Sequence, residues 1–213
     1  MVPERFVGID VGQRALHAVA LTDRGGGRLR VAGGEVFSPE ELDVVVAWCV
    51  GARVAVDAPL GPATVGEDAH PAVSRKFRLA RCAEVELGVR HGIWVPWAAP
   101  REAPAAGWMA VGFALADALI AAGHDVLETY PHGVFRRLAG TRRPALPKKT
   151  TVDGLRARVS LLSEAGVDGI TALWSHDAVD AAACAIVARD QVHGRAEAVT
   201  CGHDRSVMHL PSP

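Results

Sequence analysis

The first third of the chain alternates apolar stretches with short polar turns, as strands of a sheet do. Residues 5–11 (RFVGIDV), 15–22 and 28–37 are apolar stretches, and the glycine-rich sequence DRGGGR separates the last two. Gly-rich turns of this kind connect antiparallel strands, so we expect these three strands to pair as hairpins. Two further β-rich runs, RVAVD at 53–57 and a segment ending near Glu128, predict two more strands.

Helical patterns separate the later strands. The first helix is expected between Ser38, as its N-cap, and Gly51, with Pro39 at the first helical position. Others are expected at about 72–90, 106–122, 151–165 and 175–191. Strands separated by helices run parallel through right-handed crossovers. The sequence therefore predicts an α/β fold: a mixed five-stranded sheet, its first three strands antiparallel and the later ones parallel, with helices on both faces.

This pattern predicts one domain over residues 1–192. A Pro-, Gly- and Trp-containing stretch at about 59–104 breaks the alternation of strands and helices, and we expect it to be an insertion of loops around one helix. Residues 193–213 carry no clear period and are expected to form an irregular tail.

Composition and charge exclude several classes of protein. The 213 residues are 49% hydrophobic with a formal net charge of −1, so any nucleic-acid binding must use local patches. Four widely spaced cysteines without a Cys-x-x-Cys pair suggest neither a disulfide framework nor a zinc site. No signal peptide and no apolar run of roughly 20 residues is seen, so we expect a soluble protein of the reducing cytoplasm without membrane contact.

Acidic residues occur at positions where the pattern predicts burial. Asp10 interrupts the first strand, and an ionised carboxylate buried there is costly unless a cation balances it. Asp57 and Glu128 end two expected parallel strands, whose carboxyl ends form the usual ligand edge of an α/β sheet. Asp177 and Asp180 are three positions apart and share one face of the last helix.

Together these five acids predict a catalytic metal centre. Two carboxylates about 4 Å apart repel by about 4 kcal/mol at an effective dielectric near 20, so a cluster must be protonated or hold a cation. An all-oxygen ligand set favours Mg²⁺ or Mn²⁺, which can support hydrolysis of a phosphodiester. Structural roles stay open: Asp177 can stabilise a helix start, Asp57 can order a turn and Glu128 can pair with an arginine.

Two basic clusters could bind the phosphates of a nucleic acid. The candidates are Arg75, Arg78 and Arg81 in the inserted helix, and Lys148 and Lys149 in a basic loop after the fifth strand. Such charge runs are also typical of an ordinary solvated surface. The tryptophans Trp94, Trp97, Trp108 and Trp174 are expected to anchor the core or loops rather than to stack on bases.

Five motifs in order carry a resemblance to a known family: VGIDVG, VAVDAPLG, RLARCAEVELG, VLETYPHGVFRRLAG and HDAVDAAACAIVA. Over about residues 5–190 the chain resembles the domain of unknown function 429 family, which implies a predicted nuclease with a ribonuclease-H-like fold. The last motif is also similar to that of RuvC-type junction resolvases. Their four-acid site would map onto Asp10, Asp57, Asp177 and Asp180. The resolvases usually carry Glu in place of Asp57. Glu128 has no clear counterpart in them, and a fifth metal ligand, a general base and a structural ion-pair partner are its open roles.

The leading hypothesis is therefore a metal-dependent nuclease, with two alternatives. The sequence GIDVG followed by a hairpin also resembles the phosphate-binding element of the sugar-kinase, Hsp70 and actin superfamily, which would imply nucleotide binding. A non-catalytic interaction protein on the same fold is the other alternative. Metal-dependent cleavage would favour the nuclease, and ATP binding would favour the nucleotide-binding protein. The absence of both would favour the interaction protein.

Overall fold

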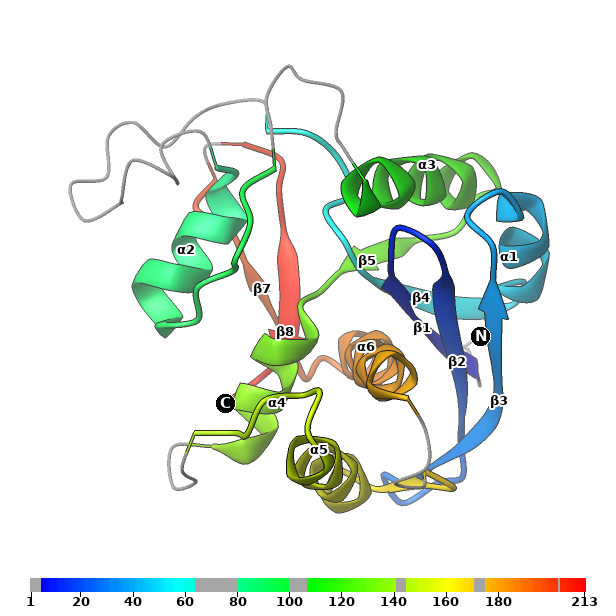
Figure 1. Cartoon of the computed structure of the whole chain (residues 1–213), viewed down its shortest axis with the longest axis vertical. Coiled ribbons are helices and arrows are strands. Elements are labelled where there is room, and N and C mark those ends of the chain that lie inside the picture. The colour runs from blue at the N-terminus through cyan, green and yellow to red at the C-terminus, as the bar shows by residue number, and fades with distance from the viewer. Residues whose placement is uncertain (1–4, 64–79, 100–106, 141–144, 171–174, 203) are drawn as a thin grey trace.

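A mixed β-sheet forms the centre of the structure (Figure 1). The computed structural model describes residues 5–63, 80–99, 107–140, 145–170, 175–202 and 204–213. Six strands of these residues lie in the order β5-β4-β1-β2-β3-β6. Their bounds are β1 (Arg5–Val11), β2 (Leu16–Asp23), β3 (Leu29–Phe37), β4 (Ala52–Asp57), β5 (Val126–Glu128) and β6 (Val167–Asp168).

The strand directions confirm the predicted fold class. The pairs β1–β2 and β2–β3 are antiparallel, and β1–β4, β4–β5 and β3–β6 are parallel. The strand β6 was not predicted, because two residues are too few to show a period. The sheet therefore has one more strand than the sequence indicated.

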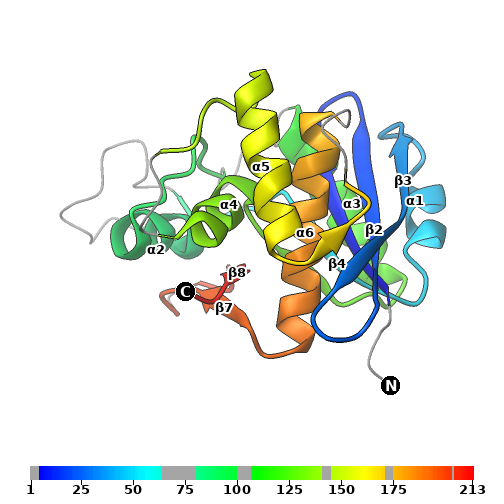
Figure 2. The same ribbon diagram turned by 90° about the horizontal axis from the view of Figure 1, so that it is seen from below.

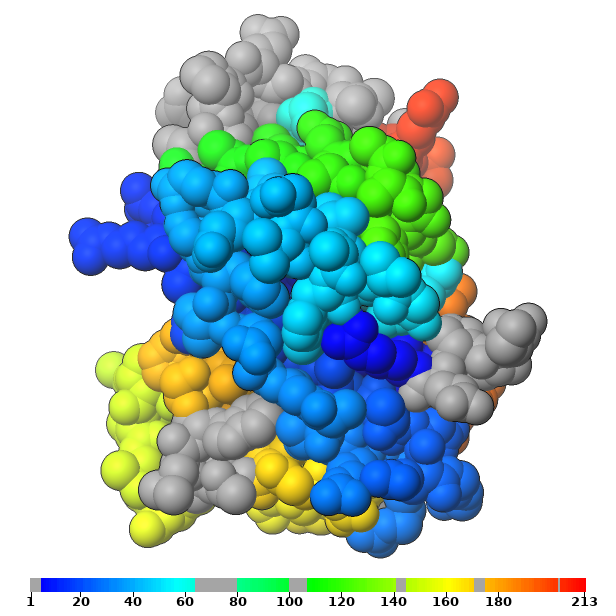
Figure 3. Space-filling view, turned by 90° about the vertical axis from the view of Figure 1, so that its right-hand side faces the viewer, coloured from blue at the N-terminus to red at the C-terminus, as the bar shows by residue number. Residues whose placement is uncertain are grey.

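Side chains alternate along β1 and build two separate cores. Val7 and Ile9 pack with residues of α1 (Leu42–Trp48) and α3 (Trp108–Ala121) on one face of the sheet. Figure 3 shows the side of the molecule that α1, α3 and the outer strands form. Phe6 belongs to the core on the opposite face, against α6 (His176–Val192). Asp10 follows the same alternation and points to the α6 face.

Close packing of α6 on the sheet depends on small residues. A Cβ atom at Gly8 would lie 1.9 Å from the carbonyl oxygen of Ala181 and 2.3 Å from the backbone nitrogen of Ala185. Only glycine therefore permits β1 and α6 to approach this closely. As Figures 1 and 2 show, α6 is central, with the sheet on one side and α5 (Val152–Glu164) on the other. This packing brings the acids of α6 over the acids of the strands.

Three helices differ from the sequence prediction. The first, α1, begins at Leu42 with Glu41 before it, because Ser38 closes a turn by accepting a hydrogen bond from the Glu41 backbone N–H instead of capping the helix. The helix α4 (Pro131–Ala139), with proline in its first turn, was missed within the motif that follows β5. The insertion helix α2 is described over Cys82–His91, and residues 72–79 of the predicted helix lie outside the described residues.

The predicted irregular tail is wrong. Strands β7 (Ala196–Val199) and β8 (Met208–Pro211) pair as an antiparallel two-stranded sheet. Thr129, directly after β5, bridges His209 of β8 and donates its hydroxyl to the His209 carbonyl oxygen at 2.7 Å. The C-terminal segment therefore lies along the end of the main sheet.

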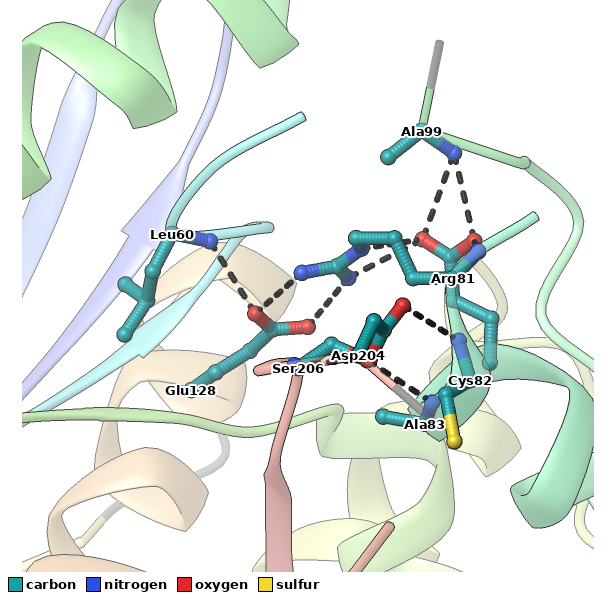
Figure 4. A network of polar contacts seen from close by, with 9 residues as sticks. Leu60, Arg81, Cys82, Ala83, Ala99, Glu128, Asp204 and Ser206 are labelled. Atoms are coloured by element: carbon teal, nitrogen blue, oxygen red, sulfur yellow. Dashed lines mark hydrogen bonds and ion pairs between the residues drawn. The ribbon is translucent and has the colours of Figure 1, made fainter. Parts of the chain in front are cut away.

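The C-terminal segment is also attached to α2. A disulfide joins Cys82 to Cys201, so the prediction of unpaired cysteines is wrong for these two, while Cys49 and Cys184 are free and buried. The side chains of Asp204 and Ser206 accept hydrogen bonds from the backbone N–H groups of Cys82 and Ala83 (Figure 4). None of the described helices combines the length and apolar character that crossing a lipid bilayer requires.

Candidate functional site

Asp10 and Asp57 lie side by side at the centre of the sheet. They are partners in the register of the parallel strands β1 and β4, so both side chains point to the α6 face. Asp10 is only 7% exposed, and its charge, after burial, raises the pKa of the neighbouring Asp57.

The first turns of α6 add Asp177 and Asp180. Ser175 caps this helix by accepting a hydrogen bond from the Ala178 N–H at 3.1 Å, as the sequence predicted. Asp180 is 3% exposed and its charge acts on Asp10 and Asp57. Asp177 is half-buried and lines one pocket together with Asp10 and Asp57. The structure therefore brings four of the five predicted acids into one neighbourhood.

Lys149 supplies a positive charge to this neighbourhood. Its Nζ lies 2.6 Å from Asp180 Oδ2 and its side chain is 44% exposed, so the expected contact with substrate stays a prediction. The backbone before it is fixed on α5: Arg158 donates to the Pro147 carbonyl oxygen at 3.0 Å. A Cβ atom at Gly154 would lie 1.9 Å from the Lys148 carbonyl oxygen, so this glycine allows the segment to lie against α5.

The raised pKa values of the acids indicate that the charge of one lysine does not compensate for their burial and mutual repulsion. Burial, with a smaller effect of Asp180, raises the pKa of Asp10 to about 7. Burial and the charge of Asp10 raise the pKa of Asp57 well above its usual range. Burial also raises the pKa of Asp180, although Lys149 opposes the shift. The site would therefore be stabilised by additional positive charge.

The donor atoms of the site suit a hard divalent cation. All are carboxylate oxygens, and Asp57 Oδ1 is enclosed without a hydrogen-bond partner among the described residues. Within the described part of the chain, no three His, Cys, Asp or Glu side chains are already arranged around a metal position. Lys149 holds one oxygen of Asp180. The chemistry of the ligands fits Mg²⁺ or Mn²⁺. In this structure the positive charge at the site is the ammonium group of Lys149.

His17 is a neighbour of the site that the sequence reading missed. It is the partner of Asp10 in the antiparallel register of β1 and β2, so both side chains lie on the same face. His17 Nε2 lies 3.6 Å from Asp177 Oδ2, and His176 Nδ1 lies 2.6 Å from Asp177 Oδ1. The hairpin register could have indicated His17, since it fixes which residue faces Asp10.

Glu128 stands apart from the four aspartates. It is level with Val56 and not with Asp57, and successive side chains of a strand point to opposite faces. Its carboxylate binds the Arg81 guanidinium at 2.5 and 2.6 Å and accepts from the Leu60 N–H (Figure 4). Of its open roles, the structure supports the ion pair.

The basic residues that were predicted to bind substrate lie in different environments. Arg81 is 2% exposed and pairs with Glu84 and Glu128, which corrects its expected role in binding substrate. Arg75 and Arg78 lie outside the described residues. Lys148 is exposed and lines a pocket beside the aspartates.

Two pockets meet at the acidic cluster. One, of about 350 Å³, is lined by Asp10, Asp177 and Trp108; the other, of about 540 Å³, by Asp180, Tyr130 and His132. Asp57, Trp97 and Lys149 line both. A bound molecule in either pocket would therefore lie next to Asp57 and Lys149.

The strand order, with three antiparallel strands followed by parallel ones, matches the ribonuclease-H-like fold that the sequence led us to expect. Residues 8–205 match the family described as "Protein of unknown function (DUF429)", and the chain belongs to this family.

Two solved structures are similar to this chain at low sequence identity. A structure of T. thermophilus RuvC in complex with Holliday junction substrate is 17% identical, with a TM-score of 0.48, covering 90% of this chain and 95% of that chain. A second Thermus thermophilus RuvC structure is 18% identical, with a TM-score of 0.47 and the same coverages. No curated protein matches the chain.

Proposed function

We propose that this protein is a divalent-metal-dependent nuclease that hydrolyses phosphodiester bonds of nucleic acid. The observation that carries the proposal is the meeting of Asp10, Asp57 and Asp180, from two strands and a helix, next to two pockets. Burying these charges together costs free energy, and a structural role alone would be served by apolar residues at the same positions.

In this proposal Asp10, Asp57, Asp177 and Asp180 hold Mg²⁺ or Mn²⁺. When bound, such an ion supplies the positive charge that activates water and stabilises charge developing on the phosphate. The four side chains arise from β1, β4 and α6; β4 pairs with β1, and the close contact at Gly8 holds β1 against α6. A rigid arrangement of this kind keeps the carboxylates oriented without rearrangement during the reaction.

Lys149 and His17 have supporting roles in the proposed reaction. The Lys149 ammonium group lies at the junction of the two pockets, where it can pair with a phosphate oxygen of the substrate. His17 is 20% exposed beside Asp177, and an imidazole there can accept or donate a proton.

The test is cleavage of labelled single-stranded, duplex, RNA–DNA hybrid and branched substrates by purified protein with Mg²⁺ or Mn²⁺. We expect cleavage that stops in chelator and falls by about 100-fold or more in Asp10→Asn and Asp180→Asn, because loss even of a group that only orients a metal ligand typically costs about 10- to 100-fold. Asp168→Asn is the control, because Asp168 forms an exposed ion pair with Arg28 away from the site. Circular dichroism checks that each variant is folded.

Two results would contradict the proposal. One is the absence of cleavage of every substrate with both metals, and the other is cleavage that Asp10→Asn leaves unchanged. ATP binding without cleavage, measured by calorimetric titration, would favour the nucleotide-binding alternative.

A further inference from the structure

The larger of the two pockets at the acidic cluster has an aromatic wall. Trp97, Tyr130 and His132 line it, and its volume of about 540 Å³ is within the range of small-molecule sites. Asp57 and Asp180 line the same pocket. An aromatic surface therefore lies next to the carboxylates of the proposed nuclease centre.

Edge-to-face contacts fix the aromatic rings in place. The ring centroid of Trp97 lies 5.0 Å from that of Trp108 at 78° and 5.0 Å from that of Tyr130 at 87°. Tyr130 in turn lies 5.7 Å from the His132 ring. Aromatic pairs prefer such tilted arrangements, which hold each ring in one orientation. The wall is thus preformed, and a planar ligand can bind it without first ordering the side chains.

Basic side chains also line this pocket. Lys148 is exposed and forms no ion pair with any described residue. Lys149 forms an ion pair with Asp180. Arg158 donates a hydrogen bond to the carbonyl oxygen of Pro147, the residue before the two lysines. A ligand with a flat apolar part and a phosphate matches this combination of rings and ammonium groups.

The position of Trp97 links the wall to the reaction centre. Trp97, Asp57 and Lys149 line both pockets, so a group that lies on the Trp97 ring is a neighbour of the carboxylates. In a duplex the faces of the bases are stacked on one another and are not available to a protein ring. Only a nucleotide that is unpaired and unstacked can place its base on this wall.

We propose that the aromatic pocket of Trp97, Tyr130 and His132 receives an unpaired nucleobase whose phosphate lies at Lys149 and the acidic cluster. This inference rests on the proposed nuclease function and names its substrate class: single-stranded nucleic acid, or the unpaired nucleotides of a branched or looped one. The tryptophan Trp97 is then a specificity-determining residue and not only a loop anchor.

The test measures binding without metal, so that it does not depend on cleavage. Fluorescence anisotropy in chelator compares a labelled oligothymidine, the same strand with abasic sites throughout, and a duplex of the same length. We expect the single strand with bases to bind at least about tenfold more tightly than the abasic strand and the duplex, as for stacking of one base.

Substitutions at Trp97 assign the effect to the pocket. Trp97→Leu should abolish the preference for bases, whereas Trp97→Phe, which keeps an aromatic ring, should retain most of it. The control is Trp48→Leu, because Trp48 belongs to α1 on the opposite face of the sheet. Melting temperatures check that the variants fold.

The outcomes separate this inference from the proposed function. Equal binding of the base-containing and abasic strands, no binding of either strand, or a preference that survives Trp97→Leu overturns the pocket assignment. Base-dependent binding that Trp97→Leu abolishes and Asp168→Asn, at an exposed ion pair away from the site, leaves unchanged supports it even if no substrate is cleaved. Cleavage with base-independent binding overturns the pocket and leaves the nuclease function standing.

Discussion

Lys149 Nζ and Asp180 Oδ2 are 2.6 Å apart, and the carboxylate of this ion pair is buried beside Asp10 and Asp57. One ammonium group therefore faces three carboxyl groups, and the pKa values of all three acids are raised. Lys149 is itself 44% exposed, so it can move away from the cluster without leaving a buried ammonium group. A metal cation can therefore compete with the Lys149 ammonium group for the carboxylate of Asp180.

Removing the lysine should make this competition visible. In the metal-free protein, Lys149→Met should lower the free energy of unfolding by about 1–3 kcal/mol, less than for a fully buried pair because the lysine is half-exposed. Stabilisation by added Mn²⁺ should be larger than in the wild type, because no ammonium group occupies Asp180. Thermal unfolding with increasing Mn²⁺ measures both, and Lys148→Met is the matched control. An unchanged response to Mn²⁺ in Lys149→Met would contradict the competition.

The raised pKa of Asp10 predicts how stability depends on pH without metal. The unfolded aspartate has a pKa of 3.8 and the folded one a pKa of about 7, so between these values the folded protein keeps a proton that the unfolded chain releases. This group therefore stabilises the fold at low pH and loses its contribution as the pH rises toward about 7. Denaturant unfolding in chelator at several pH values should show the decline. Asp10→Asn should make the profile flatter, and a profile as steep as that of the wild type would refute this origin.

The ion pair of Glu128 predicts a structural phenotype. Glu128→Gln leaves the buried Arg81 with Glu84 as its remaining carboxylate partner, so stability should fall by about 1–3 kcal/mol. Mn²⁺ affinity should stay that of the wild type, because Glu128 points away from the four aspartates. Calorimetric titration and denaturant unfolding measure the two quantities. A loss of Mn²⁺ affinity as large as that of Asp10→Asn would return Glu128 to the metal centre.

The contact between β1 and α6 predicts a large effect of a single methyl group. In Gly8→Ala the new Cβ would overlap the backbone of α6 at Ala181 and Ala185, so stability should fall by about 3 kcal/mol or more. The control is Gly33→Ala in strand β3 of the same sheet, where the added Cβ would only meet the Trp48 ring at 3.9 Å. Denaturant unfolding compares the two variants. Equal stability of both would show that α6 can shift away from β1.

The disulfide predicts a dependence on redox conditions. Cys82 and Cys201 close a loop of 119 residues, and breaking such a link typically costs about 2–4 kcal/mol. A reducing agent and Cys201→Ser should therefore lower the melting temperature to the same extent, and the agent should not affect the variant further. Alkylation under denaturing, non-reducing conditions should modify Cys49 and Cys184 only. Modification of all four cysteines would show that the disulfide is not formed.

The main sheet and its acids could be predicted from sequence because both depend on local patterns. Alternating apolar residues fixed the faces of β1, and the charge of Asp10 within that pattern indicated a site. The register of β1 with β4 could not be read in the same way. This register places Asp57 beside Asp10. The register of β4 with β5 places Glu128 beside Val56, so Glu128 points to the other face of the sheet.

Tertiary contacts account for the elements that the sequence did not reveal. The strands β7 and β8 are short and become regular by pairing with each other, so no period marks them. Cys82 and Cys201 are far apart in the chain, and only the fold brings their Cα atoms to 5.5 Å. The pairing of the exposed Lys149 with Asp180 could not be predicted, because it depends on how α5 holds the backbone before the lysine.

The bridge between Thr129 and His209 also matters for association between molecules. β5 is a terminal strand of the sheet, and an uncovered terminal strand offers free N–H and C=O groups on which a strand of another chain can assemble. The last residues occupy part of that position through β8. A chain shortened before Met208 would keep its aspartates and still be prone to aggregate, so the C-terminal strand protects the colloidal behaviour of the protein as well as its fold.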